Sequence, residues 1–237
     1  MTTSGTIEFS TNASQIINDA YMTCGAIDIE GAPTAAQYVF ALRMINRMIK
    51  QWQTRGVSLH FFKDITVTLT ANVGSYVVGT GQTAPNIATA RPMRVISANR
   101  KDAAGNETEL TIISREDYSR LSDKTNTGVP TQLYYDRQLS TGTLYFWPVP
   151  VDSLSTAIIT IERQVEIFTT DGDTPDFPVE TDLALVYGLA AVLCDSLTIP
   201  PQSAGSIKQS ANDYFNQVLM TDQETTSYFF QPDRRQK

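Results

Sequence analysis

Apolar residues recur at alternating steps of three and four positions between Pro33 and Gly56. This spacing is typical of one face of an α-helix, and it predicts a long helix over that range. A second apolar strip lies beside the first, so the helix needs neighbours on more than one side. We therefore expect it at the centre of a helical bundle. The first stripe consists of Ala35, Tyr38, Leu42, Ile45, Ile49 and Trp52, and the second of Phe40, Met44 and Met48.

Three more stretches have a helical period. The first covers residues 12–24 and begins with capping-box spacing between Asn12 and Gln15. Two others lie near the C-terminus, where consecutive prolines separate them and Ser203 is the expected cap of the second. Their apolar stripes are Leu183, Val186, Ala190, Leu193 and Leu197 in one, and Ile207, Ala211, Tyr214 and Val218 in the other.

Between the helices the apolar period changes to two, which is the alternation of a β-strand. Ile65, Val67 and Leu69 alternate with threonines and give the clearest example. Ser114 begins a short predicted helix within this region, with two acidic residues in its first turn. The predicted strands are 59–70, 76–78, 93–99, 110–113, 132–138, 143–150 and 155–168.

The order of these elements predicts an α+β fold. The simplest packing joins the N- and C-terminal helix pairs as one four-helix bundle, with the β-rich block inserted between its halves. In residue ranges, 1–58 and 176–221 form the discontinuous helical bundle and 59–175 the β-rich insertion. Residues 222–237 form an extended C-terminal tail.

The composition narrows the classes of function. A formal net charge of -7 argues against a large basic face that reads DNA, although it allows a surface along which DNA slides. Cys24 and Cys194 are too few for a disulfide framework, and we interpret them as buried, reduced thiols. The N-terminus lacks the pattern of a secretory signal, and no segment approaches the roughly 20 apolar residues of a membrane span.

Motifs for catalysis or for a cofactor are missing from the sequence. His60 is the only histidine, which leaves no convincing catalytic triad and no zinc site. The glycines in residues 79–82 lack the lysine of a P-loop, so we interpret that stretch as a turn. Glu116 and Asp117 are explained by the first turn of a helix. Oxygen ligands that could suit calcium cluster at Asp171, Asp173 and Asp176, but their spacing does not fit an EF-hand loop. We therefore expect no cofactor and no metal.

The C-terminal tail places an aromatic triplet beside basic residues. Such a triplet suits a peptide that docks into a groove on a partner, and a frayed terminus is the alternative interpretation. The candidate docking residues are Tyr228, Phe229, Phe230, Arg234, Arg235 and Lys237.

Three stretches of the β-rich block, residues 76–98, 128–139 and 142–150, together resemble the podovirus head-to-tail adaptor family. Its members are also called tail accessory, head-completion or packaged-DNA-stabilisation proteins. The flanking helical segments 49–56 and 182–193 agree with the family pattern. The order and spacing of all five segments carry the resemblance, which extends over most of the chain.

The resemblance implies a structural virion protein rather than an enzyme. Family members form a ring, usually dodecameric, beneath the portal at the head-tail junction. The implied partners are other copies of the chain, the portal protein, the tail nozzle protein and packaged double-stranded DNA that passes through the lumen without sequence-specific contact. The C-terminal segment, here residues 227–237, is expected to reach the portal. Phe40, Met44 and Met48 are a candidate inter-subunit strip, unless they only complete the bundle core.

Two other classes of function stay open at this point. One is a virion-associated hydrolase of the cell wall that uses two carboxylates. The other is a module that binds carbohydrate or a receptor through exposed aromatic rings. Its candidate residues are Tyr134, Tyr135, Tyr145 and Trp147, of which strand alternation should bury at least half.

Overall fold

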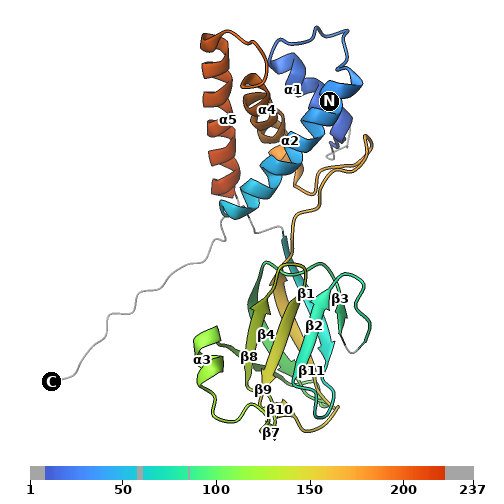
Figure 1. The fold of residues 1–237 in the computed structure, drawn as a ribbon, viewed down its shortest axis with the longest axis vertical. Coiled ribbons are helices and arrows are strands. Elements are labelled where there is room, and N and C mark those ends of the chain that lie inside the picture. Colours follow the sequence, from blue (N-terminus) through green and yellow to red (C-terminus); the bar gives the residue numbers. More distant parts are fainter. Residues whose placement is uncertain (1–8, 58–60, 85, 222–237) are drawn as a thin grey trace, which may run out of the picture. The chain divides into compact units, whose positions relative to one another are not determined.

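The computed structural model describes residues 9–57, 61–84 and 86–221. The chain forms an α+β protein of two compact units (Figure 1). We call residues 9–57 and 167–221 the helical unit, and the described part of residues 61–166 the β unit. The β unit is inserted in sequence between the two halves of the helical unit.

Helix α1 (Ala13–Thr23) confirms the predicted capping box. The Asn12 side chain accepts a bond from the Gln15 N–H at 2.9 Å, and the Gln15 side chain accepts one from the Asn12 N–H at 3.0 Å. These two bonds satisfy backbone donors that a helix start otherwise leaves free. Gly25 follows the helix with a φ of 69°, a conformation that glycine adopts without strain.

Helix α2 (Ala35–Thr54) also begins with a capping box, between Thr34 and Gln37. Its predicted stripe is buried only in the second half of the helix. Ala35 is exposed, Tyr38 and Leu42 are half-buried, and the buried side chains begin at Ala41. The buried residues of α2 are Ala41, Ile45, Met48, Ile49, Trp52 and Gln53.

Helix α4 (Asp182–Cys194) contacts α1, α2 and α5, and α2 likewise contacts α1, α4 and, through Trp52 and Phe215, α5. The expectation that the long helix is central therefore stays a prediction, because α2 and α4 each contact the three other long helices. Helix α4 packs closely against its neighbours because it is apolar on nearly every side and has a glycine where α2 approaches. A Cβ added at Gly188 would lie only 2.8 Å from Met48 Sδ. The predicted α4 stripe also needs correction, because Leu183 is 53% exposed whereas Ala184 and Leu185 are buried.

Helix α5 (Pro201–Thr221) begins before the predicted cap at Ser203. The Ala204 N–H donates to the Pro200 carbonyl at 3.0 Å, so Ser203 lies inside the first turn. Proline suits this position because the first helical N–H groups have no partner within the helix. The buried residues of α5 are Ala211, Phe215 and Val218, and a short 3-10 helix, η2 (Val179–Thr181), precedes α4.

Residues 167–175 belong to the helical unit rather than to the β-rich insertion in which the sequence analysis placed them. The reason is a pair of backbone bonds to the start of α1. The N–H groups of Ala13 and Ser14 donate to the carbonyls of Asp173 and Asp171, at 2.9 and 3.1 Å. The loop thereby satisfies helix donors that the capping box does not reach.

The β unit contains two larger sheets whose inner residues form one core. Ile65, Ile159 and Ile161 from one sheet join Leu144 and Phe146 from the other. The first sheet has the order β1 (Phe62–Thr68), β11 (Thr156–Glu162), β4 (Arg94–Lys101) and β5 (Glu107–Glu109). The second has the order β3 (Ile87–Ala88), β2 (Ser75–Gly79), β9 (Gly142–Trp147), β8 (Gln132–Arg137) and β6 (Thr111–Ile112). A separate parallel pair joins β7 (Thr127–Gly128) and β10 (Val149–Pro150).

The chain crosses between the two sheets at Leu110. Strand β5 pairs with β4, and the Leu110 N–H still donates to the Ala98 carbonyl at 2.8 Å. The next N–H, that of Thr111, donates to the Thr131 carbonyl instead, and β6 runs parallel to β8. The strand that pairs with β4 at this point is therefore not the predicted strand 110–113, which contains β6 and pairs with β8. That role belongs to β5, whose side chains are all exposed and carry no apolar pattern.

Helix α3 (Arg115–Arg120) confirms the short helix that Ser114 caps. The Ser114 hydroxyl accepts a bond from the Asp117 N–H at 3.1 Å. Glu116 forms an ion pair with Arg120 one turn later. The two acidic residues therefore have partners in the helix itself, and the geometry gives them no further role.

Candidate interaction surface

Two adjoining cavities open on the helical unit where α4 begins. Their volumes are about 340 and 380 Å³, and Phe177, Pro178 and Thr181 line both. We call them the first and the second cavity. Volumes of this size fall at the lower end of the range for pockets that hold a small organic group, roughly 300 to 1,000 Å³.

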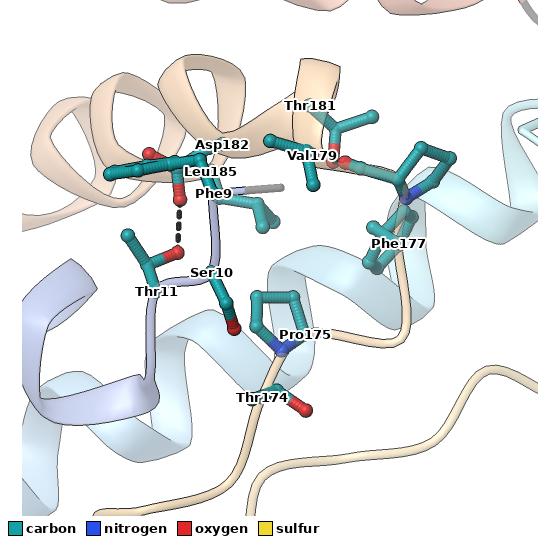
Figure 2. Close-up of a pocket in the computed structure, with 11 residues that line it drawn as sticks. Phe9, Ser10, Thr11, Thr174, Pro175, Phe177, Val179, Thr181, Asp182 and Leu185 are labelled. Carbon is teal, nitrogen blue, oxygen red and sulfur yellow. Dashed lines mark hydrogen bonds between the residues drawn. The ribbon is translucent and has the colours of Figure 1, made fainter. Parts of the chain in front are cut away.

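The first cavity lies between the segment that precedes α1 and the segment that precedes α4 (Figure 2). The Thr11 hydroxyl donates to the Asp182 carboxylate and so ties the two segments together. Phe9 and Val179 are both lining residues, yet they are 59% and 47% exposed. The lining of the first cavity therefore combines partly exposed apolar side chains with one polar contact.

The loop below the first cavity is held by the Asp173 carboxylate. It accepts bonds from the N–H groups of Thr169 and Thr170, at 2.6 and 2.8 Å, and from both threonine hydroxyls. These bonds lower the pKa of the Asp173 carboxylate well below its ordinary value, and the bonds from Thr170 have the largest effect. The carboxylate thus stabilises its own loop. Among the described residues no group of three or more His, Cys, Asp or Glu side chains is arranged to hold a metal ion.

The second cavity is more apolar. Its walls come from Val57 after α2, the segment before α4, the start of α4 and the last turns of α5. Leu183, one of the lining residues, is 53% exposed. Glu180 supplies the one carboxylate among the described residues that line it. Besides the three shared residues, the lining consists of Val57, Glu180, Leu183, Ala184, Tyr214, Gln217, Val218 and Thr221. A hollow with apolar walls and an exposed apolar edge suits an apolar or aromatic side chain of another polypeptide segment.

An aromatic cluster supports the wall of the second cavity. The ring of Trp52 packs against Phe215 at a centroid distance of 5.2 Å and edge-on against Phe177 at 6.0 Å. The guanidinium of Arg55 lies over the Phe215 ring at 5.5 Å. These contacts join α2, α5 and the segment before α4. They pack behind Phe177 and so stabilise the wall of the second cavity.

The predicted inter-subunit strip divides in the structure. Met48 is 6% exposed and packs against Gly188 of α4, so it belongs to the core of the helical unit. Phe40 and Met44 are half-buried and keep part of their surface accessible. An inter-subunit role therefore stays a prediction for Phe40 and Met44. Two other predicted features, the six tail residues from Tyr228 to Lys237 and the single histidine His60, lie outside the described residues.

The four aromatic side chains proposed for sugar binding form ring contacts or hydrogen bonds within the β unit. Tyr134 and Tyr145 stack with Tyr118 of α3, which sequence reasoning missed, at centroid distances of 4.9 and 5.2 Å. The Tyr135 hydroxyl donates to the Pro92 carbonyl at 2.8 Å, and burial raises its pKa to about 12. The indole N–H of Trp147 donates to the Asp123 carbonyl at 2.9 Å. Each of the four side chains therefore has a partner within the β unit.

The two cysteines meet in the core of the helical unit, although they are far apart in sequence. Both are buried and free, as predicted, and their Sγ atoms are 3.7 Å apart. The Cys24 thiol donates to the Ala190 carbonyl at 3.3 Å. Burial, followed by the contact with Cys194, raises the pKa of the Cys24 thiol to about 12. The reactive thiolate of Cys24 is therefore disfavoured at neutral pH.

We expect both thiols of the folded protein to resist a thiol reagent such as DTNB at pH 8. Because the thiols are buried and Cys24 stays protonated, labelling should proceed only as fast as the helical unit opens. The measurement is the absorbance of released thionitrobenzoate, with unfolded protein as the two-thiol reference. An exposed control, Thr198→Cys, should react at once at its new thiol. Fast labelling of two thiols in the folded wild type would contradict the described core.

A comparison with known protein families shows the family of this chain. The family described as SU10 adaptor protein matches residues 11–236, which is nearly the whole sequence. The chain belongs to the SU10 adaptor protein family. This is a family of phage head-tail adaptors, so the resemblance seen in the sequence is confirmed, and its members are structural components of the virion. Among individual curated proteins, none matches the sequence.

Membership in a structural family explains what the site contains. The surface of this adaptor-family member offers two cavities where α4 begins, and the second of them has mostly apolar walls. Within the described part of the chain, no helix is both long and apolar enough to span a membrane.

Proposed function

We propose that this adaptor-family member is a structural virion protein that forms a ring between the portal and the tail. The ring extends the DNA channel beyond the portal and helps to retain the packaged genome. The observation that carries the proposal is the family match over residues 11–236. Because that match includes both units, the proposal concerns the whole chain and not one grafted module.

The charge of the chain supports the part of the proposal that concerns DNA. With 25 acidic and 18 basic residues, the protein lacks the excess of cations that tight phosphate binding needs. A lumen with this charge would contact DNA only weakly and through its backbone, without reading sequence. Weak contact suits a channel through which the genome has to move in both directions.

The proposed ring closes through a heterologous contact, in which one face of a subunit meets a different face of the next. Phe40 and Met44 on α2 are the candidates for one of these faces, because part of each side chain remains accessible. We further propose that α1, α2, α4 and α5 form a four-helix bundle that carries this contact. The tail, residues 222–237, then serves as a separate arm that reaches the portal.

We expect the isolated protein to sediment as a monomer and to assemble when the portal of the same phage is added. The portal presents a ring of equivalent sites, so it should nucleate the adaptor ring. Sedimentation velocity of the free protein, of the portal and of the mixture measures this directly. A stable ring of the isolated protein would count against nucleation by the portal.

Truncation after Thr226 is expected to weaken binding to the portal by at least about tenfold, because buried aromatic anchors carry much of the energy of such contacts. The same gradients, loaded with the truncated chain, measure the loss. A matched variant that replaces Tyr228, Phe229 and Phe230 with alanine keeps the length and charge of the tail and tests the rings alone. If binding survives truncation, the joint with the portal lies on the helices instead of on the tail.

A further inference from the structure

The described part of the chain ends at the second cavity. Thr221 is the last described residue, the last residue of α5 and a lining residue of that cavity. Sixteen residues follow it in the sequence, and six of them, 222–227, precede the aromatic triplet of Tyr228, Phe229 and Phe230. Six extended residues span up to about 20 Å, which is ample to turn back into a cavity that begins at the same point.

We infer that the second cavity is the docking site of the chain's own aromatic triplet, Tyr228 to Phe230. The walls offer the chemistry that such rings need, namely Leu183, Ala184, Tyr214 and Val218 around a volume of about 380 Å³. Leu183 is 53% exposed in the described chain, an unusual position for a leucine in the first turn of the most buried helix. An aromatic ring placed on it would cover that surface.

Charge favours the same segment as the occupant. Residues 167–221, which supply most of the cavity wall, contain seven acidic residues and a single lysine. The end of the tail, residues 231–237, contains three basic residues and one acidic residue. Glu180 at the cavity lies among these acidic residues, so the basic end of the tail would be attracted to the surface on which the triplet docks. Tethering adds to this attraction, because a short linker gives an effective concentration in the millimolar range.

Docking within one chain has a consequence that rests on the proposed function. The same triplet cannot fill its own cavity and a groove on the portal at once, so contact with the portal must release it. A free subunit would then keep its aromatic arm covered until the portal is present. The docking itself does not depend on this consequence and is tested without the portal.

Hydrogen exchange of the full-length protein, followed by mass spectrometry, tests the docking. Amides of residues 222–237 should exchange at least about tenfold more slowly in the wild type than in Leu183→Glu, which places a charge at the cavity edge. Val39→Glu is the matched control, because Val39 is 55% exposed on α2 and lines neither cavity. It should keep the wild-type protection. Circular dichroism of both variants checks that the helices are intact.

A second measurement uses the NMR signals of residues that line the second cavity. Replacing Phe229 and Phe230 with leucine removes two ring currents and should shift the methyl NMR signals of Ala184 and Val218, while those of Ile65 and Ile159 in the β unit stay in place. Tail amides that exchange at the rate of an unstructured peptide in the wild type would overturn the inference. Protection that appears only at high protein concentration would overturn docking within one chain and assign the cavity to a second copy. Portal binding that persists despite a negative result would leave the proposed function standing.

Discussion

Replacing Trp52 with alanine is expected to lower the free energy of unfolding of the helical unit by about 3–5 kcal/mol, the range for deleting a large buried aromatic side chain. Trp52 is 5% exposed, and its ring contacts Phe177 and Phe215. It also lies close to Gly188 of α4. Its removal would therefore leave a cavity where α2, α4 and α5 meet, and neighbours held at both ends by helices cannot collapse fully into it.

Urea unfolding followed by far-UV circular dichroism measures this loss, because nearly all of the long helices belong to the helical unit. The variant retains Trp147 in the β unit as its only tryptophan, so fluorescence reports that unit separately. Val39→Ala is the control on the same helix and should change stability by no more than about 0.5 kcal/mol, since Val39 is 55% exposed. A loss for Trp52→Ala as small as that of the control would contradict the described packing.

Phe146→Ala is expected to cost the β unit a similar amount, about 3–5 kcal/mol. Phe146 is 2% exposed on β9 and meets Tyr76 of β2 edge-on at a centroid distance of 5.5 Å. The Tyr76 hydroxyl in turn accepts a bond from the Thr70 N–H at 2.7 Å. Loss of the Phe146 ring therefore removes core volume and loosens the anchor of the chain segment that follows β1.

Tryptophan fluorescence during urea unfolding, measured in a Trp52→Phe background that leaves Trp147 as the single tryptophan, reports the effect of Phe146→Ala. Leu139→Ala serves as the control, because Leu139 is an equally apolar residue of the same unit but is 97% exposed. The control should unfold with the wild type. Equal stability of Phe146→Ala and the wild type would mean that the two sheets do not share the core described here.

Local signals in the sequence predicted the starts of α1 and α3, because capping depends on a few neighbouring residues, but they misplaced the start of α5 at Ser203. Asn12 with Gln15 and Ser114 with Asp117 form the expected bonds. The burial of α4 was harder to predict for the opposite reason. When nearly every residue of a helix is apolar, periodicity no longer distinguishes an inner from an outer face, and Leu183 was assigned to the wrong one.

Long-range contacts could not be predicted from local pattern. The crossing at Leu110 depends on which distant strand accepts each N–H, and no neighbouring residue encodes that choice. The second cavity is built from residues near 57, 177–184 and 214–221, three segments that come together only in the folded unit. The stack of Tyr118 on Tyr134 was not predicted for a similar reason, because Tyr118 lies on a short helix that has no buried residue.

The family resemblance supplied what the residue pattern could not. Single motifs of the β unit, such as the strand before Pro148, are ordinary, whereas the order of several such stretches identified an adaptor, and the family match over residues 11–236 confirms it. The structure adds a surface that the sequence did not reveal, a pair of apolar cavities at the start of α4. For a protein that works by assembly, such a surface is where partner segments are expected to bind.

The mass of the complex between this adaptor and the portal of its phage tests the central claim most directly. Native mass spectrometry of the purified mixture should give the mass of the portal plus a fixed whole number of 26.2 kDa chains. The same number should recur at every adaptor excess, as a closed ring requires. A mass equal to that of the portal alone, at an adaptor concentration far above that of the portal, would contradict the account.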